Sequence, residues 1–248
     1  MNPILLVTGG SRGIGAACAL LAARQGWDVA VNYTSDSVAA EAVVAQVRAF
    51  GRRAITLRAD VADEAAVLAM FHAVDRELGP LQGLVNNAGV VDVAARIDEG
   101  SVARWQRMFN INVIGSMVCA REAVRRMSTK HGGQGGVIVN LSSAAARIGA
   151  PGQYVDYASA KAAIDVFTLG LAREVANEGI RVNAVRPGII DTDIHASAGL
   201  PDRASRMAPS LPMQRAGTAD EVGEAIVWLL SDASSYTTGS VVEVTGGR

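Results

Sequence analysis

The sequence predicts an α/β fold in which a parallel sheet is covered by helices on both faces. Short β-branched runs alternate almost strictly with longer helical patterns, which is the order of elements in chains that build such sheets. The runs are apolar at consecutive positions, as expected of parallel strands buried on both faces. No linker rich in Pro, Gly or Ser divides the chain, so we expect residues 1–248 to form a single domain.

The expected elements follow in order along the chain. Strand candidates cover residues 4–8, 28–33, 54–59, 83–87, 136–143, 180–187 and 240–246. Helix candidates begin near Gly13, Ser37, Asp63, Ser101, Gly152 and Thr218. Four of the seven prolines fall between residues 187 and 212, where no periodicity is clear. We therefore expect a substrate lid over about residues 188–215, because long loops in compact domains are often active-site lids.

Charge and composition narrow the function classes. The chain carries 23 basic and 24 acidic residues, with a net charge of −1 and no run of like charges. Neither nucleic acid nor a membrane surface is therefore an expected partner, and a small molecule is. The N-terminal stretch has no basic region before a long apolar one, and no run approaches 18 apolar residues. A cytoplasmic protein is expected.

Residue types that bind metals are few and scattered. Cys18 and Cys119 both fall within apolar helical patterns, which indicates packed free thiols. His72, His131 and His195 have no spacing with carboxylates that would suit a metal ion. No metal site is predicted.

A glycine-rich turn, TGGSRGIG at residues 8–15, joins the first strand candidate to the first helix candidate. Gly9, Gly13 and Gly15 would let the backbone approach a pyrophosphate, whose charge suits the amides and positive end of the new helix. Ser11, Arg12 and Ile14 belong to the same turn. The site is predicted to bind a dinucleotide.

The tip of the second strand indicates which dinucleotide. An acidic residue there would bind a ribose 2′-hydroxyl and repel a 2′-phosphate. The tip reads Asn32, Tyr33, Thr34 and Ser35, with no carboxylate before Asp36. Arg12 can reach the same point and pair with a phosphate, and a solvated loop arginine is the alternative interpretation. NADP(H) is favoured, and NAD is possible.

Tyr157 and Lys161 form a second candidate site in the stretch QYVDYASAK. On a helix they are i and i+4 neighbours, about 5 to 6 Å apart at Cβ, whereas Tyr154 lies seven residues from Lys161. The ammonium is expected to lower the phenol pKa from about 10 toward neutrality. The pair would then act as a general acid and base.

Together these motifs resemble the short-chain dehydrogenase/reductase family. The resemblance spans nearly the entire chain and rests on TGGSRGIG, Asp60, Asn86-Asn87-Ala88-Gly89, Asn112, Ser143, Tyr157-x-x-x-Lys161 and Pro187-Gly188 in order. It implies a Rossmann-type, doubly wound fold with seven parallel strands in the order 3-2-1-4-5-6-7. It also implies cofactor contacts beyond the glycine-rich turn and the second-strand tip, at Asp60, Val61, Asn87, Ala88, Gly89, Tyr157, Lys161, Pro187, Gly188, Ile190 and Thr192.

The resemblance assigns chemistry to four of these positions. Tyr157 would exchange the proton, Ser143 would bind the substrate oxygen, and Lys161 would also bind the nicotinamide ribose. Asn112 is similar to an asparagine that anchors a proton-relay water, with Asn110 as its rival. Ser143 stands fourteen residues before Tyr157, one more than in many relatives. Asp60 would accept from adenine, while Asp63 fits the role of helix cap better.

Substrate contacts are the least constrained predictions. Tyr154 is expected to line the substrate pocket, or else to be a packed core residue. His195, in a lid that also holds Asp202, Arg203 and Arg206, is a candidate substrate contact, or else a solvated histidine. This lid could accept a polar substrate.

The sequence predicts an NADP(H)-preferring oxidoreductase that interconverts a small ketone and a secondary alcohol. Sugars and 3-oxoacyl thioesters are alternative substrates, and an acyl carrier would need a basic patch such as Arg125, Arg126 and Lys130. A catalytically silent nucleotide sensor is the rival class. The alanine-rich helix over residues 157–175 predicts a homo-oligomer, a tetramer or a dimer.

Overall fold

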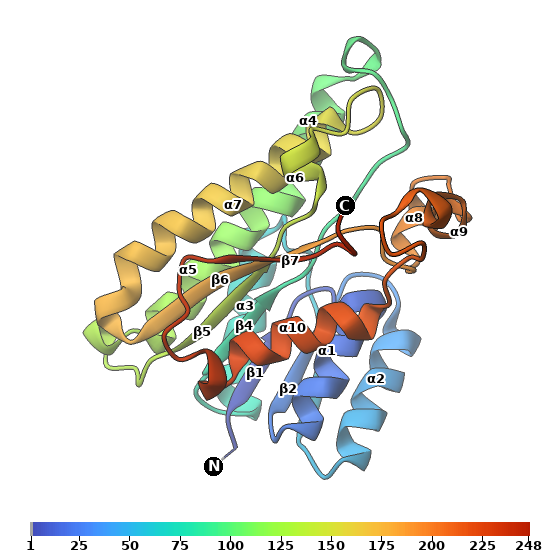
Figure 1. The fold of residues 1–248 in the computed structure, drawn as a ribbon. Helices are drawn as coiled ribbons and strands as arrows, with labels where there is room; N and C mark the ends of the chain where they lie inside the picture. Colours follow the sequence, from blue (N-terminus) through green and yellow to red (C-terminus); the bar gives the residue numbers. More distant parts are fainter. Residues whose placement is uncertain (1) are drawn as a thin grey trace.

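The computed structural model describes residues 2–248, apart from the side chains of His195 and Ser197. Its centre is a seven-stranded sheet in the order β3-β2-β1-β4-β5-β6-β7, and every pairing is parallel (Figure 1). The strands are β1 (Ile4–Val7), β2 (Asp28–Tyr33), β3 (Ala54–Arg58), β4 (Gly83–Asn86), β5 (Gly136–Leu141), β6 (Ile180–Pro187) and β7 (Val241–Val244). The predicted fold class and strand order are confirmed.

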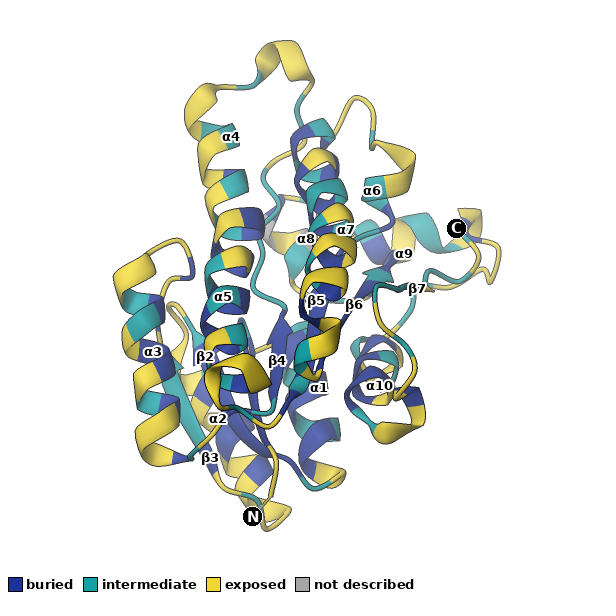
Figure 2. Cartoon of the chain, turned by 90° about the vertical axis from the view of Figure 1, so that its left-hand side faces the viewer, coloured by how far each residue is buried: buried dark blue, intermediate teal, exposed yellow. Residues whose placement is uncertain are grey.

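Helices cover both faces of this sheet. They are α1 (Gly13–Arg24), α2 (Ser37–Ala49), α3 (Glu64–Glu77), α4 (Val102–Phe109), α5 (Gly115–Met127), α6 (Ala145–Ile148), α7 (Val155–Val175), α8 (Ile194–Ser197), α9 (Arg203–Met207) and α10 (Ala219–Leu230). Helices α1, α2 and α10 pack on one face, and α3, α5 and α7 on the other (Figures 1 and 2).

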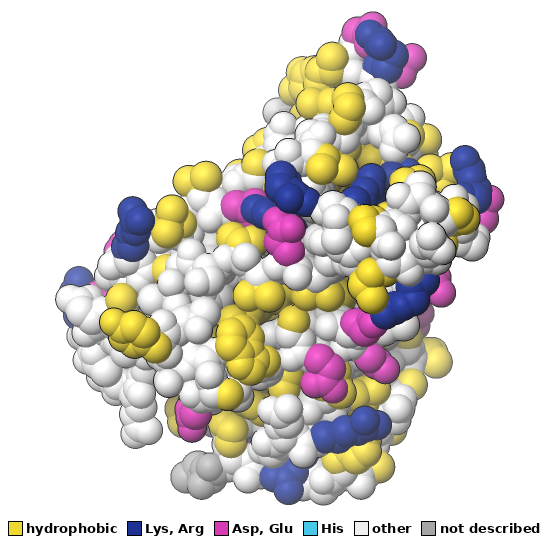
Figure 3. All heavy atoms as spheres, in the orientation of Figure 1, with side chains coloured by type: hydrophobic (Ala, Val, Ile, Leu, Met, Phe, Trp, Pro, Cys, Tyr) yellow, Lys and Arg dark blue, Asp and Glu magenta, His cyan; other side chains and the backbone are white. Residues whose placement is uncertain are grey.

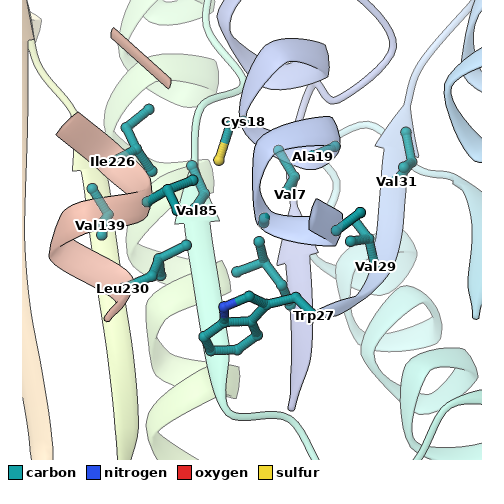
Figure 4. Packing of buried hydrophobic residues seen from close by; sticks show 14 of the residues in the cluster. Val7, Cys18, Ala19, Trp27, Val29, Val31, Val85, Val139, Ile226 and Leu230 are labelled. Carbon is teal, nitrogen blue, oxygen red and sulfur yellow. The ribbon is translucent and has the colours of Figure 1, made fainter. Parts of the chain in front are cut away.

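Two hydrophobic cores result from the alternation of side chains along the strands. Leu5 and Val7 of β1 join the core beneath α1, α2 and α10, where Trp27 also packs (Figure 4). Ile4 and Leu6 point to the opposite core, beneath α3, α5 and α7. Because successive residues of a strand face opposite ways, a strand that is apolar throughout serves both cores.

Local signals in the sequence define several helix ends. Asp63 accepts hydrogen bonds from the amides of Ala65 and Ala66 and caps α3, as predicted. Asp36 caps α2 in the same way, through the amide of Ala39. Helix α10 begins with a capping box formed by Thr218 and Glu221.

Both cysteines are buried within the helix faces that cover the sheet. Burial raises the pKa of the Cys18 thiol to about 12, and it does the same for Cys119. These are free thiols inside the two cores, as the sequence predicted. None of the helices within residues 2–248 is long and apolar enough to span a bilayer.

The structure also contains turns that the periodicity did not predict. Helices α4 and α5 are joined by a π-helical turn over Asn110–Ile114, so the chain stays helical from Val102 to Met127 with one irregular turn. The fifth strand ends at Leu141, which leaves Ser142 and Ser143 just beyond it. The chain then forms α6 before α7 begins at Val155, three residues later than predicted.

Candidate active site

A cavity of about 310 Å³ opens at the edge of the sheet where the strands end. Parallel sheets bind ligands at this edge, beyond the carboxyl ends of their strands. The cavity brings together twelve of the predicted residues: Ile14, Asn87, Gly89, Asn112, Ser143, Tyr154, Tyr157, Lys161, Pro187, Gly188, Ile190 and Thr192. Residues more than 170 positions apart in the sequence therefore share one site.

The conformation and packing of the glycine-rich turn require glycine at several positions. Gly9 and Gly13 have φ angles of +61° and +55°, which favour glycine. A Cβ at Gly15 would lie 2.4 Å from the carbonyl oxygen of Gly9, so Gly15 is needed for packing within the turn. A Cβ at Gly13 would meet only Thr192, at 3.5 Å. Glycine is therefore required at Gly13 by its backbone conformation, at the start of a helix where an anionic phosphate would be favoured.

Hydrogen bonds from neighbouring strands hold this turn in place. The side chain of Asn87 donates to the carbonyl oxygens of Thr8 and Gly9, at 2.9 Å each. The hydroxyl of Thr8 accepts from the amides of Asn87 and Ala88 at 3.0 Å. The turn after β1 and the turn after β4 are thus one hydrogen-bonded unit.

Asn32 was predicted to contact the cofactor, but its side chain bonds to the protein's own main chain. Its side chain is buried, accepts from the amide of Gly9 at 3.1 Å and donates to the carbonyl oxygens of Leu57 and Ala59. Both hydrogens of the Asn32 amide group are therefore bonded within the protein. The side chain stabilises the glycine-rich turn through its hydrogen bond from Gly9. The tip of β2 that faces outward consists of Tyr33, Thr34 and Ser35.

One basic side chain borders this tip, and a second belongs to the glycine-rich turn. Arg12 is exposed at the start of α1. Arg58, which the sequence reasoning missed, is exposed and donates to the carbonyl oxygen of Thr34 at 3.2 Å. Parallel pairing places Arg58 beside Tyr33, so the register of the second and third strands was the signal that could have found it. Asp36, the nearest carboxylate along the chain, is the cap of α2.

Asp60 lies at the same edge beyond β3. It is exposed and accepts from the amide of Ala62 at 2.9 Å, while Asp63 caps the helix. Val61 beside it is buried. Asp60 therefore stands in a short turn at the surface, consistent with the position predicted for an adenine contact.

Tyr157, Ser143 and Lys161 meet at the cavity. All three line its wall, and Ser143 lies near enough to the Tyr157 phenol to influence its pKa. Ser142, which was expected to face away from the cavity, also lines it, and its hydroxyl donates to the main-chain oxygen of Lys161 at 3.3 Å. Between α6 and α7 the chain turns at Ala150, which has a φ of +43°.

Lys161 is buried, and its ammonium group donates to the main-chain oxygen of Leu141 at 2.7 Å. The same nitrogen lies 5.7 Å from the centre of the Tyr157 ring. Burial lowers the pKa of Lys161 to about 8, against the opposing charge of Asp165. The lysine is thus held by the end of β5 beside the phenol, one helical turn along α7.

The expected depression of the Tyr157 pKa is wrong for this structure. Burial raises the pKa of the phenol, and the side chain of Ser143 opposes this effect without overcoming it. The loss of water on burial disfavours the charged phenolate, and the spacing of Tyr157 and Lys161 carries no information on burial. Tyr157 therefore holds its proton at neutral pH, as a proton donor must.

Asn112 lies on the π-helical turn and lines the cavity. Its side chain accepts from the amide of Val90 at 3.1 Å and donates to the main-chain oxygens of Val90 and Met108 at 3.0 Å. A Cβ at Gly89 would lie 2.7 Å from the Asn112 oxygen. The rival, Asn110, is exposed and is not part of the cavity wall.

The residues predicted to contact the substrate differ in whether the structure places them at the cavity. Tyr154 is buried and lines the cavity, so the pocket and core interpretations both describe it. The side chain of His195 lies outside the described part of the structure. Arg203, from the predicted lid, and Arg248 also line the cavity. Arg248 could not have been found from the sequence, because its position depends on the packing of the chain after β7.

The suggested basic patch for an acyl carrier does not adjoin this cavity. Arg125 and Arg126 lie at the end of α5, which runs back to the opposite edge of the sheet, where Gly135 precedes β5 and bonds to Met127. Both arginines are ion-paired with Glu122, and Arg126 also pairs with Asp75. Their charges are locally balanced, so this hypothesis is not supported within the chain.

Comparisons with known proteins agree with the fold. A family model described as enoyl-(acyl carrier protein) reductase matches residues 9–248. The chain is 53% identical over 245 residues to the uncharacterized oxidoreductase YgfF of Escherichia coli, covering 99% of both chains. It is 37% identical over 249 residues to the 3-oxoacyl-(acyl-carrier-protein) reductase FabG of Staphylococcus aureus, covering 100% of this chain and 98% of that one.

A solved structure is similar over nearly the entire length. A short-chain dehydrogenase from Burkholderia cenocepacia in complex with NADP superposes with a TM-score of 0.90 at 36% sequence identity, covering 99% of this chain and 97% of that one. The fold and the cavity thus define an NAD(P)-dependent oxidoreductase that acts on CH–OH and C=O groups. The chain belongs to the short-chain dehydrogenase/reductase family.

Proposed function

We propose that this protein is an NADP(H)-preferring reductase of a small ketone, or the dehydrogenase of the corresponding secondary alcohol. The observation that carries the proposal is the meeting of Tyr157, Ser143 and Lys161 at one cavity on the carboxyl edge of the sheet. A buried titratable pair in such a cavity is typical of an active site.

The chain's own residues would divide the work at the carbonyl. Tyr157, protonated at neutral pH, would donate its proton to the carbonyl oxygen, and Ser143 would stabilise the negative charge that develops there. When bound, a reduced nicotinamide supplies the hydride that converts the carbonyl carbon to the alcohol carbon. In the opposite direction Tyr157 would accept the hydroxyl proton.

Lys161 and Asn112 would support this exchange. Lys161 would bind the ribose of the cofactor and keep a positive charge beside Tyr157. The side-chain hydrogens of Asn112 are already bonded to main-chain oxygens, so the side chain holds the π-helical turn against Val90. A proton-relay water at Asn112 would therefore bind the remaining lone pair of its side-chain oxygen, because both amide hydrogens are already bonded.

The preference for NADP(H) rests on charge at the tip of β2. Arg58 bonds to the main chain at Thr34, and no carboxylate stands within the tip itself. Arg12 is exposed in the glycine-rich turn, whose Gly9 and Gly10 amides bond to Asn32. A 2′-phosphate there would form charge-assisted hydrogen bonds. The similar structure from Burkholderia cenocepacia contains NADP.

We further propose that residues 1–248 form a single domain with a substrate lid at about 188–215, which works in the cytoplasm as a tetramer or dimer. The two cores share one sheet, and the predicted lid segment contains α8 and α9 beside the cavity. Val166 and Leu169 are exposed on the outer face of α7, which gives a second copy an apolar surface to contact.

The test is NADPH and NADH oxidation against sugars, 3-oxoacyl thioesters, diketones and cyclic ketones. We expect turnover of at least one pool, faster with NADPH. The compound class that is reduced decides between sugars and 3-oxoacyl thioesters as substrates. Tight cofactor binding without turnover of any pool would contradict the proposed reaction and would instead support a catalytically silent nucleotide sensor.

A further inference from the structure

One wall of the cavity contains positive charge that no side-chain carboxylate pairs with among the described residues. Arg203, at the start of α9, and Arg248 both line the cavity. Within the described part of the chain neither guanidinium group is ion-paired, whereas Arg147, Arg186 and Arg215 each pair with a glutamate. Figure 3 shows basic side chains gathered between the C-terminus and the α8–α9 segment labelled in Figure 1.

Arg203 is held facing the cavity by its neighbours. Its guanidinium group lies 5.2 Å from the centre of the Tyr154 ring and donates to the side-chain oxygen of Gln153 at 3.0 Å. Stacking on an aromatic face orients a guanidinium group without neutralising its charge. The Tyr154 hydroxyl is buried and has no hydrogen-bond partner among the described residues, so this wall also holds an unsatisfied polar group.

Arg248 is held in place through its backbone. Arg147 donates a hydrogen bond to its main-chain oxygen, and Gly247 before it lies against Pro212. Burial lowers the pKa of Arg248, and the nearby charge of Arg203 lowers it further. The two guanidinium groups therefore repel each other across a partly desolvated space, and an anion between them would relieve that repulsion.

The remainder of the wall selects the kind of anion. Ile148, Pro151, Ile189 and Ala198 give it an apolar surface. A small carbon skeleton with one charged end fits such a surface better than a sugar, whose hydroxyls would need several polar partners.

We propose that the substrate is an oxo acid, or the corresponding hydroxy acid, whose carboxylate binds Arg203 and Arg248. This inference rests on the proposed function, because it places the carbonyl group at Tyr157 and Ser143. The carboxylate is unchanged by the reaction, in which the carbonyl gains a hydride at carbon and a proton at oxygen. Arg203 and Arg248 are thus specificity-determining residues that take no part in the hydride and proton transfer itself.

The test compares oxo acids from 2-oxo to 6-oxo with their methyl esters, which keep the carbonyl and remove the charge. The native protein should prefer one acid over its ester at least about tenfold in kcat/KM, since a charge-assisted guanidinium pair is stronger than a neutral contact. Arg203→Gln and Arg248→Gln should each lower that preference about tenfold and leave kcat/KM for the ester within about threefold.

Arg206→Gln is the matched control. Arg206 lies on the same helix, is exposed and pairs with Asp202, so its replacement should leave the preference unchanged. Equal reduction of acids and esters by the native protein would overturn the inference while the proposed function stands. The inference would also be overturned if Arg203→Gln lowered kcat/KM only for thioesters that carry a phosphorylated carrier arm. The anion that Arg203 binds would then be that phosphate.

A calorimetric titration keeps the two proposals distinguishable. Saturated carboxylates of the same lengths are titrated into the protein with and without NADP⁺. If no ketone is reduced but one acid binds and Arg203→Gln abolishes that binding, the proposed function fails and the carboxylate site stands. If no acid binds and no preference is measured, the inference is overturned.

Discussion

The two halves of the carboxyl edge differ in how far the protein satisfies its own polar groups. On the cofactor half, Asn32 and Asn87 fasten the glycine-rich turn with hydrogen bonds from both neighbouring strands. On the substrate half, Arg203 and Arg248 are not ion-paired within the described residues, and the Tyr154 hydroxyl is unsatisfied. The polar groups that hold the glycine-rich turn are therefore bonded within the protein, whereas the substrate half has polar and charged groups that a ligand could pair with.

This contrast suggests where specificity resides. A turn that is fixed before binding loses little conformational entropy when a ligand arrives, so it suits a cofactor used by a whole family. Unsatisfied charges discriminate strongly between ligands, because a ligand that fails to pair with them leaves their burial uncompensated. Three substitutions test these two descriptions, beginning with the residue at their junction.

Lys161 joins the two halves, and its buried charge should make stability depend on pH. Its pKa is lowered from 10.5 to about 8, so the unfolded chain binds the proton more tightly than the folded one. The free energy of unfolding, relative to Lys161→Met, should be constant below pH 8 and rise by about 3 kcal/mol as the pH increases through 10.5. Urea denaturation at several pH values measures this difference, and parallel curves would contradict it.

Gly15→Ala tests the self-contained packing of the cofactor half. The added Cβ would lie 2.4 Å from the Gly9 oxygen and 2.5 Å from the Asn87 nitrogen. We expect a loss of about 1 to 3 kcal/mol in stability and weaker NADPH binding, measured by denaturation and by NADPH fluorescence. Gly170→Ala is the control, because no heavy atom lies within 4 Å of its Cβ position in α7. An unchanged Gly15→Ala protein would show that the turn is more adaptable than described.

Arg12→Gln tests whether positive charge near the β2 tip favours NADPH, and it has the smallest expected effect of the three substitutions. The KM for NADPH should rise about tenfold, with that for NADH unchanged, because only NADPH carries the 2′-phosphate. Arg24→Gln, at the other end of α1, removes an exposed arginine that stacks on Phe50 and should change neither constant. Equal weakening of both cofactors would instead assign Arg12 to the shared pyrophosphate.

The same contrast explains what could be predicted from the sequence. The glycine-rich turn and the Tyr157–Lys161 spacing are local patterns, so their places in the fold followed from strand and helix periodicity. The inward role of Asn32 and the position of Arg58 required the register of neighbouring strands. Arg248 reaches the cavity through packing after β7, and the direction of the Tyr157 pKa depends on burial. Neither is encoded by spacing.

The central claim is that Tyr157 delivers the proton, and Tyr157→Phe measures it most directly. The substitution removes one oxygen atom and keeps the ring that packs beside Val113 and Ala160. With the ketone that the native protein reduces, we expect kcat to fall by about 10² to 10⁴ while NADPH binding by fluorescence stays within about twofold. A variant that binds NADPH normally and retains native kcat would contradict the account.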